Sequence, residues 1–183
     1  MTSDDRGAGS AIGLRLALVG SHQKKLRGMP RRLRAISAWA DRFEGWFPPH
    51  DAFYVDGRGS LCWYAKMPAY YELEHSTRAR SACAQSLLRA ASSVAASTPS
   101  DEFTVGAMIY APTIRSSEVF AYATPLPLLG LQISDLSLAA EWSLEVPPGL
   151  QEHGRIVVFD EDDPDERWET EMWWYISDRQ ANS

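Results

Sequence analysis

The stretch STRARSACAQSLLRAASSVAA, residues 76–96, decides the fold class, because it predicts one long helix ahead of a series of strands. It is rich in Ala, Leu and Arg, which favour helix. Ser76 or Thr77 can cap its first turn, and the Thr-Pro-Ser triplet at 98–100 ends it. Its spacing predicts a buried stripe made of Ala79, Cys83, Leu87, Ala90 or Ala91, and Val94.

A first helix is predicted upstream. It begins at Pro30. Backbone N–H groups in the first turn of a helix have no helical acceptor, so a proline, which lacks an N–H, is tolerated there. Trp39 and Trp46 broaden its apolar face, and the Pro-Pro pair at 48–49 ends it. The stripe at three- and four-residue spacing consists of Leu33, Ile36, Ala40, Phe43 and Phe47.

The remainder of the chain favours strands. A turn at 56–59 precedes an aromatic-rich strand at 61–67, which stops at Pro68. Alternation in a later strand places Trp142, Leu144 and Val146 on one face. Residues 125–137 predict a packed loop or a short helical turn. The other predicted strands are 104–110, 118–124, 141–146, 155–159 and 167–176.

This order predicts an α+β fold, a mostly antiparallel sheet with the two main helices on one face. The length of 183 residues suits one domain, which we place at residues 24–178. Residues 1–23 are expected to be a loosely ordered N-terminal extension, and residues 179–183 a C-terminal tail.

Composition indicates a globular protein with uneven charge. Hydrophobic residues make up 45% and charged residues 23%, which is not a disordered composition. The net charge of −6 divides into +5 over residues 1–50, −4 over 51–150 and −7 over 151–183. Such a gradient predicts either charged ends that meet in the fold or faces aimed at different partners.

The cysteines and the apolar segments predict a cytoplasmic protein. Cys62 and Cys83 form no C-x-x-C or zinc pattern, and a domain of this size needs no disulfide, so we expect two buried, reduced thiols. Residues 11–19 are interrupted by Arg15 and predict no signal peptide. No stretch approaches the roughly 18 apolar residues of a membrane span. No cofactor is expected.

An ordered series of short motifs resembles the bacterial family 3916 of domains of unknown function. The resemblance covers roughly residues 24–177 and implies one domain, with no established activity. This chain departs from the family pattern at Pro30 and has a more acidic final hairpin. The motifs are Lys25-Leu26-Arg27-Gly28-x-x-Arg31-Arg32, residues 63–68, Cys83-x-Gln85-x-Leu87, Pro112 with residues 116–120, Glu141-Trp142-x-Leu144-x-Val146-Pro147 and Glu169-x-Glu171-Met172-Trp173.

The segment 160–166 packs six acids into seven positions between two predicted strands. It predicts an exposed hairpin tip, because burying six carboxylates is too costly. The tip can be a solvated edge that deters strand aggregation, a surface for a basic partner, or a hard-cation site. Pro164 in its middle and the wrong spacing argue against an EF-hand-like loop.

Glu169 and Glu171 form a second candidate site. On a strand they share a face, roughly 7 Å apart, with Trp173 beside them. They can act as general acid and base, with Glu141 and Arg27 nearby, or pair with arginines of the first helix. The opposite face is predicted to be the core face and carries Trp168, Thr170, Met172, Trp174 and Ile176.

Other chemistry has little support. The chain has no G-x-S-x-G, phosphate-loop or H-E-x-x-H motif, and its four histidines share no ligand spacing. The basic segment 24–34 holds six Lys/Arg, but the negative total charge argues against a nucleic-acid partner.

The preferred hypothesis is a binding module that captures a basic partner, in the manner of an immunity or inhibitor protein. It needs the least catalytic machinery, and an acidic field beside aromatic residues suits it. The alternative is a small enzyme that uses Glu169 and Glu171 with Glu141 and Arg27. The partner-binding residues of the first hypothesis are Asp160, Asp162, Asp163, Asp165, Glu166, Trp173 and Tyr175.

Overall fold

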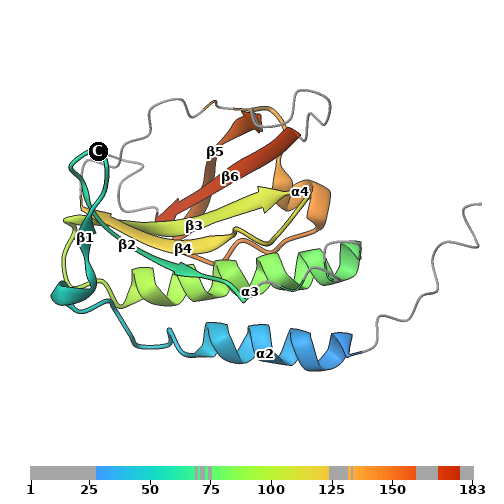
Figure 1. The fold of residues 1–183 in the computed structure, drawn as a ribbon, viewed down its shortest axis with the longest axis horizontal. Helices are drawn as coiled ribbons and strands as arrows, with labels where there is room; N and C mark the ends of the chain where they lie inside the picture. Colours follow the sequence, from blue (N-terminus) through green and yellow to red (C-terminus); the bar gives the residue numbers. More distant parts are fainter. Residues whose placement is uncertain are drawn as a thin grey trace, which may run out of the picture.

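Helix α3, Thr77–Ala96, forms where the sequence predicts it (Figure 1). The computed structural model describes residues 28–68, 70, 73, 76–123, 132, 134–159 and 169–177. Ser76 caps α3, because its Oγ accepts a hydrogen bond from the Ala79 N–H at 3.3 Å. The whole predicted stripe is buried: Ala79, Cys83, Leu87, Ala90, Ala91 and Val94.

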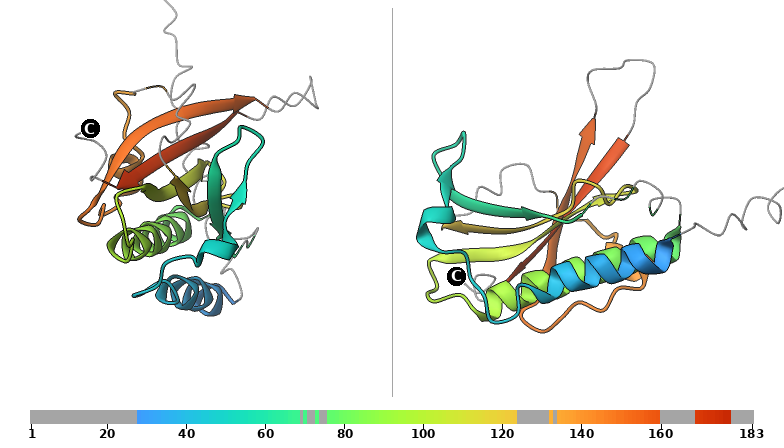
Figure 2. Two further views of the ribbon diagram at one scale, coloured as in Figure 1. Left: turned by 90° about the vertical axis from the view of Figure 1, so that its left-hand side faces the viewer. Right: turned by 60° about the horizontal axis from the view of Figure 1, so that its bottom comes forward.

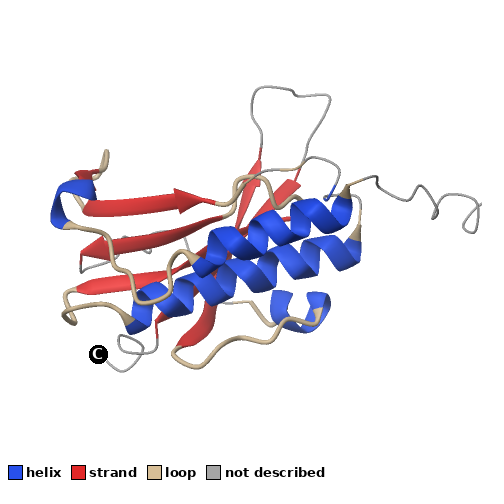
Figure 3. Cartoon of the chain, turned by 90° about the horizontal axis from the view of Figure 1, so that it is seen from below, coloured by secondary structure: helices blue, strands red, loops and turns tan. Residues whose placement is uncertain are grey.

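Helix α2, Met29–Asp41, lies beside α3 under the same face of the sheet (Figure 3). Pro30 stands in its first turn, as predicted. The helix ends earlier than predicted, because the chain turns after Asp41 and passes through Gly45 at a φ of 66°. Asp41 pairs with Arg89 of α3 at 2.8 Å, which ties the two helices together.

The sheet has six antiparallel strands in the order β1-β2-β4-β3-β6-β5. Three consecutive hairpins therefore lie side by side. The α+β prediction, with two main helices on one face, is confirmed. The strands are β1 Tyr54–Val55, β2 Leu61–Lys66, β3 Phe103–Ala111, β4 Glu118–Ala123, β5 Leu150–Phe159 and β6 Glu169–Ser177.

Three boundaries differ from the sequence prediction. The short strand β1 and the 3-10 turn η1, His50–Ala52, occupy a segment predicted to be loop. Strand β5 begins five residues earlier than predicted, and its outer edge pairs with Gln132 through two hydrogen bonds to Arg155. None of the described helices combines the length and the apolar character that crossing a bilayer requires.

The predicted strand at 141–146 is wrong. Helix α4, Leu138–Trp142, stands there instead, and Ser143 ends it in the left-handed region. The carboxylate of Glu152 on β5 accepts the N–H groups of Leu138 and Ala139, each at 3.2 Å, and so fixes the start of the helix. Trp142 is buried, as predicted, but it belongs to a helix. An alternating pattern of only three apolar residues therefore did not distinguish a strand from a helix.

After α4 the chain runs extended along the flank of α3. The side-chain amide of Gln85 donates to the Glu145 carbonyl at 2.6 Å and accepts the Glu145 N–H at 2.9 Å. Ser92 donates to the Pro148 carbonyl further along. This segment therefore behaves as a strap bound by α3, not as a strand.

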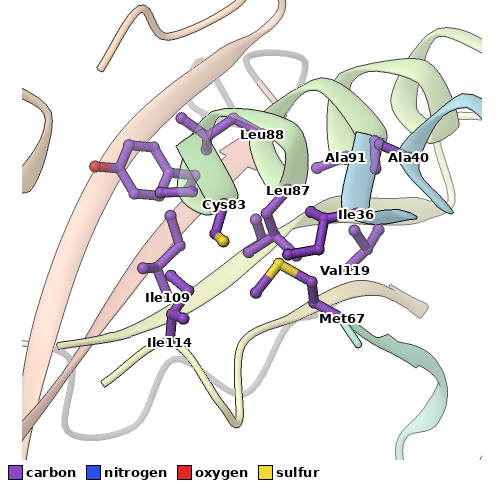
Figure 4. Packing of buried hydrophobic residues seen from close by; sticks show 14 of the residues in the cluster. Ile36, Ala40, Met67, Cys83, Leu87, Leu88, Ala91, Ile109, Ile114 and Val119 are labelled. Carbon is purple, nitrogen blue, oxygen red and sulfur yellow. The ribbon is translucent and has the colours of Figure 1, made fainter. Parts of the chain in front are cut away.

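The main core fills the space between the helices and the sheet (Figure 4). On β6, Trp173 and Tyr175 point into this core. Trp174 and Ile176 are buried as predicted, but in a second cluster on the opposite face of the sheet, with Met172 packed against it, whereas the prediction that Trp173 faces away from the core is wrong. Both faces of β6 are apolar, and alternation alone does not show which face the helices cover.

Candidate functional site

We call the sheet face turned away from α2 and α3 the distal face. The sheet twists strongly, so the β5–β6 hairpin crosses the other strands at a steep angle (Figures 1 and 2). The apolar cluster on the distal face consists of Cys62, Met108, Phe120, Tyr122, Trp174 and Ile176, with Tyr64 and Met172 packed against it.

Aromatic rings follow one another across this face. Ring centroids lie 6.2 Å apart for Tyr54–Tyr64, 5.3 Å for Tyr64–Tyr122, 5.9 Å for Tyr122–Phe120 and 5.1 Å for Phe120–Trp174. These separations suit edge-to-face contacts. We call the series Tyr54, Tyr64, Tyr122, Phe120 and Trp174 the aromatic ladder.

Glu118 is the acid on this face. It opens β4, and alternation places it on the same side as Phe120 and Tyr122. Its register neighbours are Lys66 on β2 and Met108 on β3. Only 9% of Glu118 is exposed, yet its carboxylate makes no hydrogen bond or ion pair within the part of the chain that the structure describes.

The electrostatics of Glu118 follow from that burial. Loss of water raises the pKa of the Glu118 carboxyl above its ordinary value, and the positive charge of Lys66 opposes this only in part. Burial also raises the pKa of Tyr110, and the negative charge of Glu118 adds to the effect. The ionised carboxylate thus has few stabilising contacts. Binding a proton or another cation would lower the free-energy cost of its burial.

A second polar group on the distal face is also unpaired. Within the described ranges, the side-chain atoms both sealed from solvent and without a hydrogen bond are Trp174 Nε1 and Arg80 Nε. The unpaired Glu118 oxygens are not among these sealed atoms, so they keep some contact with solvent. The carboxylate is therefore both under-solvated and reachable.

Glu171 occupies a different environment. Arg155 donates to its Oε1 at 2.6 Å, and Trp173 Nε1 donates to its Oε2 at 3.1 Å. Arg155 also donates to Ser134, and its guanidinium carbon lies 5.8 Å from the centroid of the Trp173 ring. The cation that pairs with Glu171 thus comes from the neighbouring strand, and the prediction of an arginine from the first helix is wrong.

Two residues predicted to contact a partner are buried in the main core. Trp173 is 1% exposed and Tyr175 is 0% exposed. Burial and the hydrogen bond from its hydroxyl to Glu152 raise the pKa of Tyr175. Neither side chain can offer contact area, so this part of the prediction is wrong.

The other predicted residues are not brought together. Glu141 is exposed on α4, with no hydrogen bond or ion pair to Glu171 in the described structure. Glu169 lies on β6 opposite Phe159, but its side chain is outside the described part. Also outside the described residues are Arg27, Asp160, Asp162, Asp163, Asp165 and Glu166.

The sequence prediction did not include Glu118. The sequence does contain a pattern that points to it. Glu118 precedes Phe120 by two positions and Tyr122 by four, so alternation along a strand places all three side chains on the same face. The pattern alone does not identify a site. That step also requires the burial of the distal face and the absence of an ion pair to Glu118 among the described residues, which only the structure shows.

No group of three or more His, Cys, Asp or Glu residues suited to a metal ion occurs in the described ranges. Comparisons with protein-family models, curated proteins and solved structures find no match to this chain. The resemblance to family 3916 stays an expectation that rests on the motifs alone.

Proposed function

We propose that this protein is a binding module that captures a basic partner through the distal face of its sheet. The observation that carries the proposal is Glu118, a carboxylate that is 9% exposed and makes no ion pair among the described residues, although Lys66 lies across the strand pair from it. Keeping such a group ionised is costly, and a cation supplied by a partner offsets that cost.

The charge of the whole chain supports a basic partner. The net charge is −6, and residues 151–183 alone carry −7. An acidic field of this kind speeds the encounter with a positively charged protein. The acids Asp160, Asp162, Asp163 and Asp165 are proposed as a source of that field. An inhibitor or immunity-like role in the cytoplasm, where unpaired thiols persist, fits this proposal.

The enzyme alternative has weaker support. Its central carboxylate, Glu171, already accepts one hydrogen bond on each oxygen, from Arg155 and from Trp173. These contacts hold Glu171 in place as a structural acceptor, and a general acid or base needs an oxygen that faces the substrate. Glu171 is paired with Arg155, whereas Glu141 is exposed on α4, so we prefer the binding module.

The test is affinity capture from native lysate at low and high salt, read by mass spectrometry. The wild type is compared with Glu118→Gln and with a variant in which Asp160, Asp162, Asp163 and Asp165 become Asn. We expect the wild type to capture basic proteins at low salt and both Glu118→Gln and the Asn variant to retain less of them, with the deficit of the Asn variant shrinking as the salt rises. Association of a captured basic protein with the Asn variant, measured separately at low salt, should be roughly tenfold slower. Captured proteins that are not basic, or a set that neither variant changes, would overturn the proposal.

A further inference from the structure

We infer that the distal face holds one organic cation, the ammonium or guanidinium group of a single Lys or Arg side chain of the partner, against Glu118, and that Lys66 competes with it. This inference rests on the proposed function. It adds the chemical group of the partner that is recognised, and it identifies Lys66 as a competitor within the chain. Its ligand is a cation on a flexible stem, and not a metal ion.

The site offers one carboxylate, which is the first reason for an organic cation. A hard metal ion collects several oxygen ligands. The described residues contain no cluster of three potential metal ligands, and the distal neighbours of Glu118 on β3 and β6 include Met108 and Trp174. A single carboxylate surrounded by apolar and aromatic groups instead matches one ammonium or guanidinium group.

The aromatic surroundings are the second reason. Phe120 follows Glu118 by two residues on β4, and Tyr64 pairs with Phe120 from β2. Trp174 pairs with Met108, which in turn pairs with Glu118. Ring faces attract cations within about 6 Å, and the attraction grows when water is excluded. Phe120 and Trp174 are buried, so the ring that can supply this second attraction is the partly exposed Tyr64, which lies diagonal to Glu118 across the two strands.

Lys66 is the third element. It lies directly across β2 and β4 from Glu118, and both side chains point to the distal face. Side chains in such a pair have Cβ atoms roughly 4.5–5.5 Å apart, so the Lys66 stem is long enough to bring its ammonium to the carboxylate. Lys66 is nevertheless exposed and makes no ion pair with Glu118 in the structure. Its ammonium is thus a nearby cation that any incoming cation must displace or exclude.

The same geometry makes a proton a competitor. The titratable groups that interact with Glu118 are Lys66 from β2, whose charge lowers the pKa of Glu118, and Tyr110 from β3 and Tyr54 from β1, whose pKa values the charge of Glu118 raises. Strand β6 contributes the apolar side chains of Met172 and Trp174 on this face. Protonation of Glu118 at low pH removes the charge that attracts a cation, so the affinity for a cation falls as the pH drops.

The test is an NMR titration of the full chain that follows the Trp174 indole N–H and the Met108 methyl resonances. The probes are Nα-acetyl-lysine amide, Nα-acetyl-arginine amide and, as the neutral control with the same number of side-chain carbons as Lys, Nα-acetyl-norleucine amide. The proteins are the wild type, Lys66→Gln and Glu118→Gln. Because Gln has the shape of Glu and removes a poorly solvated charge, Glu118→Gln is expected to fold, which its amide spectrum checks.

We expect at least one cationic probe to shift both resonances saturably in the wild type, and the stronger of the two identifies the Lys or Arg side chain. Lys66→Gln should bind that probe roughly two- to fivefold more tightly, because it removes a nearby positive charge that acts on Glu118 and repels the incoming cation. Glu118→Gln should lose the response, and the norleucine probe should give none.

Three results would overturn the inference: an equal response to the norleucine probe, an unchanged or weaker affinity in Lys66→Gln, or an unchanged affinity in Glu118→Gln. The proposed function is judged separately. If basic proteins are still captured in a salt-dependent way while no probe moves Trp174, the cation site fails and the binding module stands. If capture also fails, both fail.

Discussion

The backbone of Gly106 on β3 lies so close to the carbonyl group of Tyr175 on β6 that a Cβ atom at position 106 would collide with that oxygen. The same Cβ atom would come within 2.7 Å of the Phe120 ring. The contact lies where β3 joins β6, between the second and third hairpins. A glycine is therefore required for these two hairpins to form one sheet.

Gly106→Ala should destabilise the protein by about 1–3 kcal/mol or more, since backbone atoms, unlike the end of a flexible side chain, cannot move aside easily. Urea unfolding monitored by tryptophan fluorescence measures this. Gly57→Ala is the matched control, because nothing lies within 4 Å of its Cβ position. Equal stability of the two variants would contradict the close approach of β3 and β6.

Glu118→Gln should stabilise the protein at neutral pH. Because burial raises the pKa of Glu118, the folded state binds its proton more tightly than the unfolded state does. The contribution of Glu118 to the unfolding free energy is therefore highest below its unfolded pKa of about 4.3 and is lost as the pH rises through its folded value.

The gain in Tm from Glu118→Gln should thus be largest at pH 7 and vanish near pH 4. Each kcal/mol added to the unfolding free energy should raise the Tm by about 2–4 °C. Thermal melts at the two pH values measure it. Glu141→Gln, on an exposed carboxylate, should stay within about 0.5 kcal/mol of the wild type at both. A lower Tm for Glu118→Gln at neutral pH would show that the carboxylate is stabilised by a contact.

Arg155 and Glu171 should show a larger coupling than a surface ion pair. Their side chains are 21% and 33% exposed, and the pair is supported by Trp173 and Ser134. A double-mutant cycle with Arg155→Met and Glu171→Gln should give about 1–3 kcal/mol. The Asp41–Arg89 pair is 58% and 50% exposed and should give about 0.2–1 kcal/mol. Equal couplings would mean that Glu171 is not held as the structure indicates.

Cys62 and Cys83 should remain thiols. Cys62 lies in the distal cluster and Cys83 in the main core, on opposite faces of the sheet, so the two cannot form a disulfide in this fold. Burial raises the pKa of Cys83 to about 12 and raises the pKa of Cys62 as well. Intact mass should show two thiols, and both should react with a thiol reagent only after unfolding. A disulfide, or fast labelling of native protein, would refute this.

The sequence by itself determined the features that short windows encode. Ser76 and the spacing from Ala79 to Val94 specify α3, and alternation with turn residues specifies most of the strands. Together they give the α+β class, because capping, propensity and periodicity act over a few residues.

Only the tertiary structure decided which face of each strand became the main core. Trp173 and Trp174 are equally apolar, and packing of α3 on the sheet, not alternation, buries Trp173 beneath the helices. The tertiary structure also chose helix for α4, since Glu152 supplies acceptors from a distant strand. Likewise, it paired Glu171 with Arg155 and left Glu118 without an ion pair among the described residues, because such pairs depend on which distant segments meet.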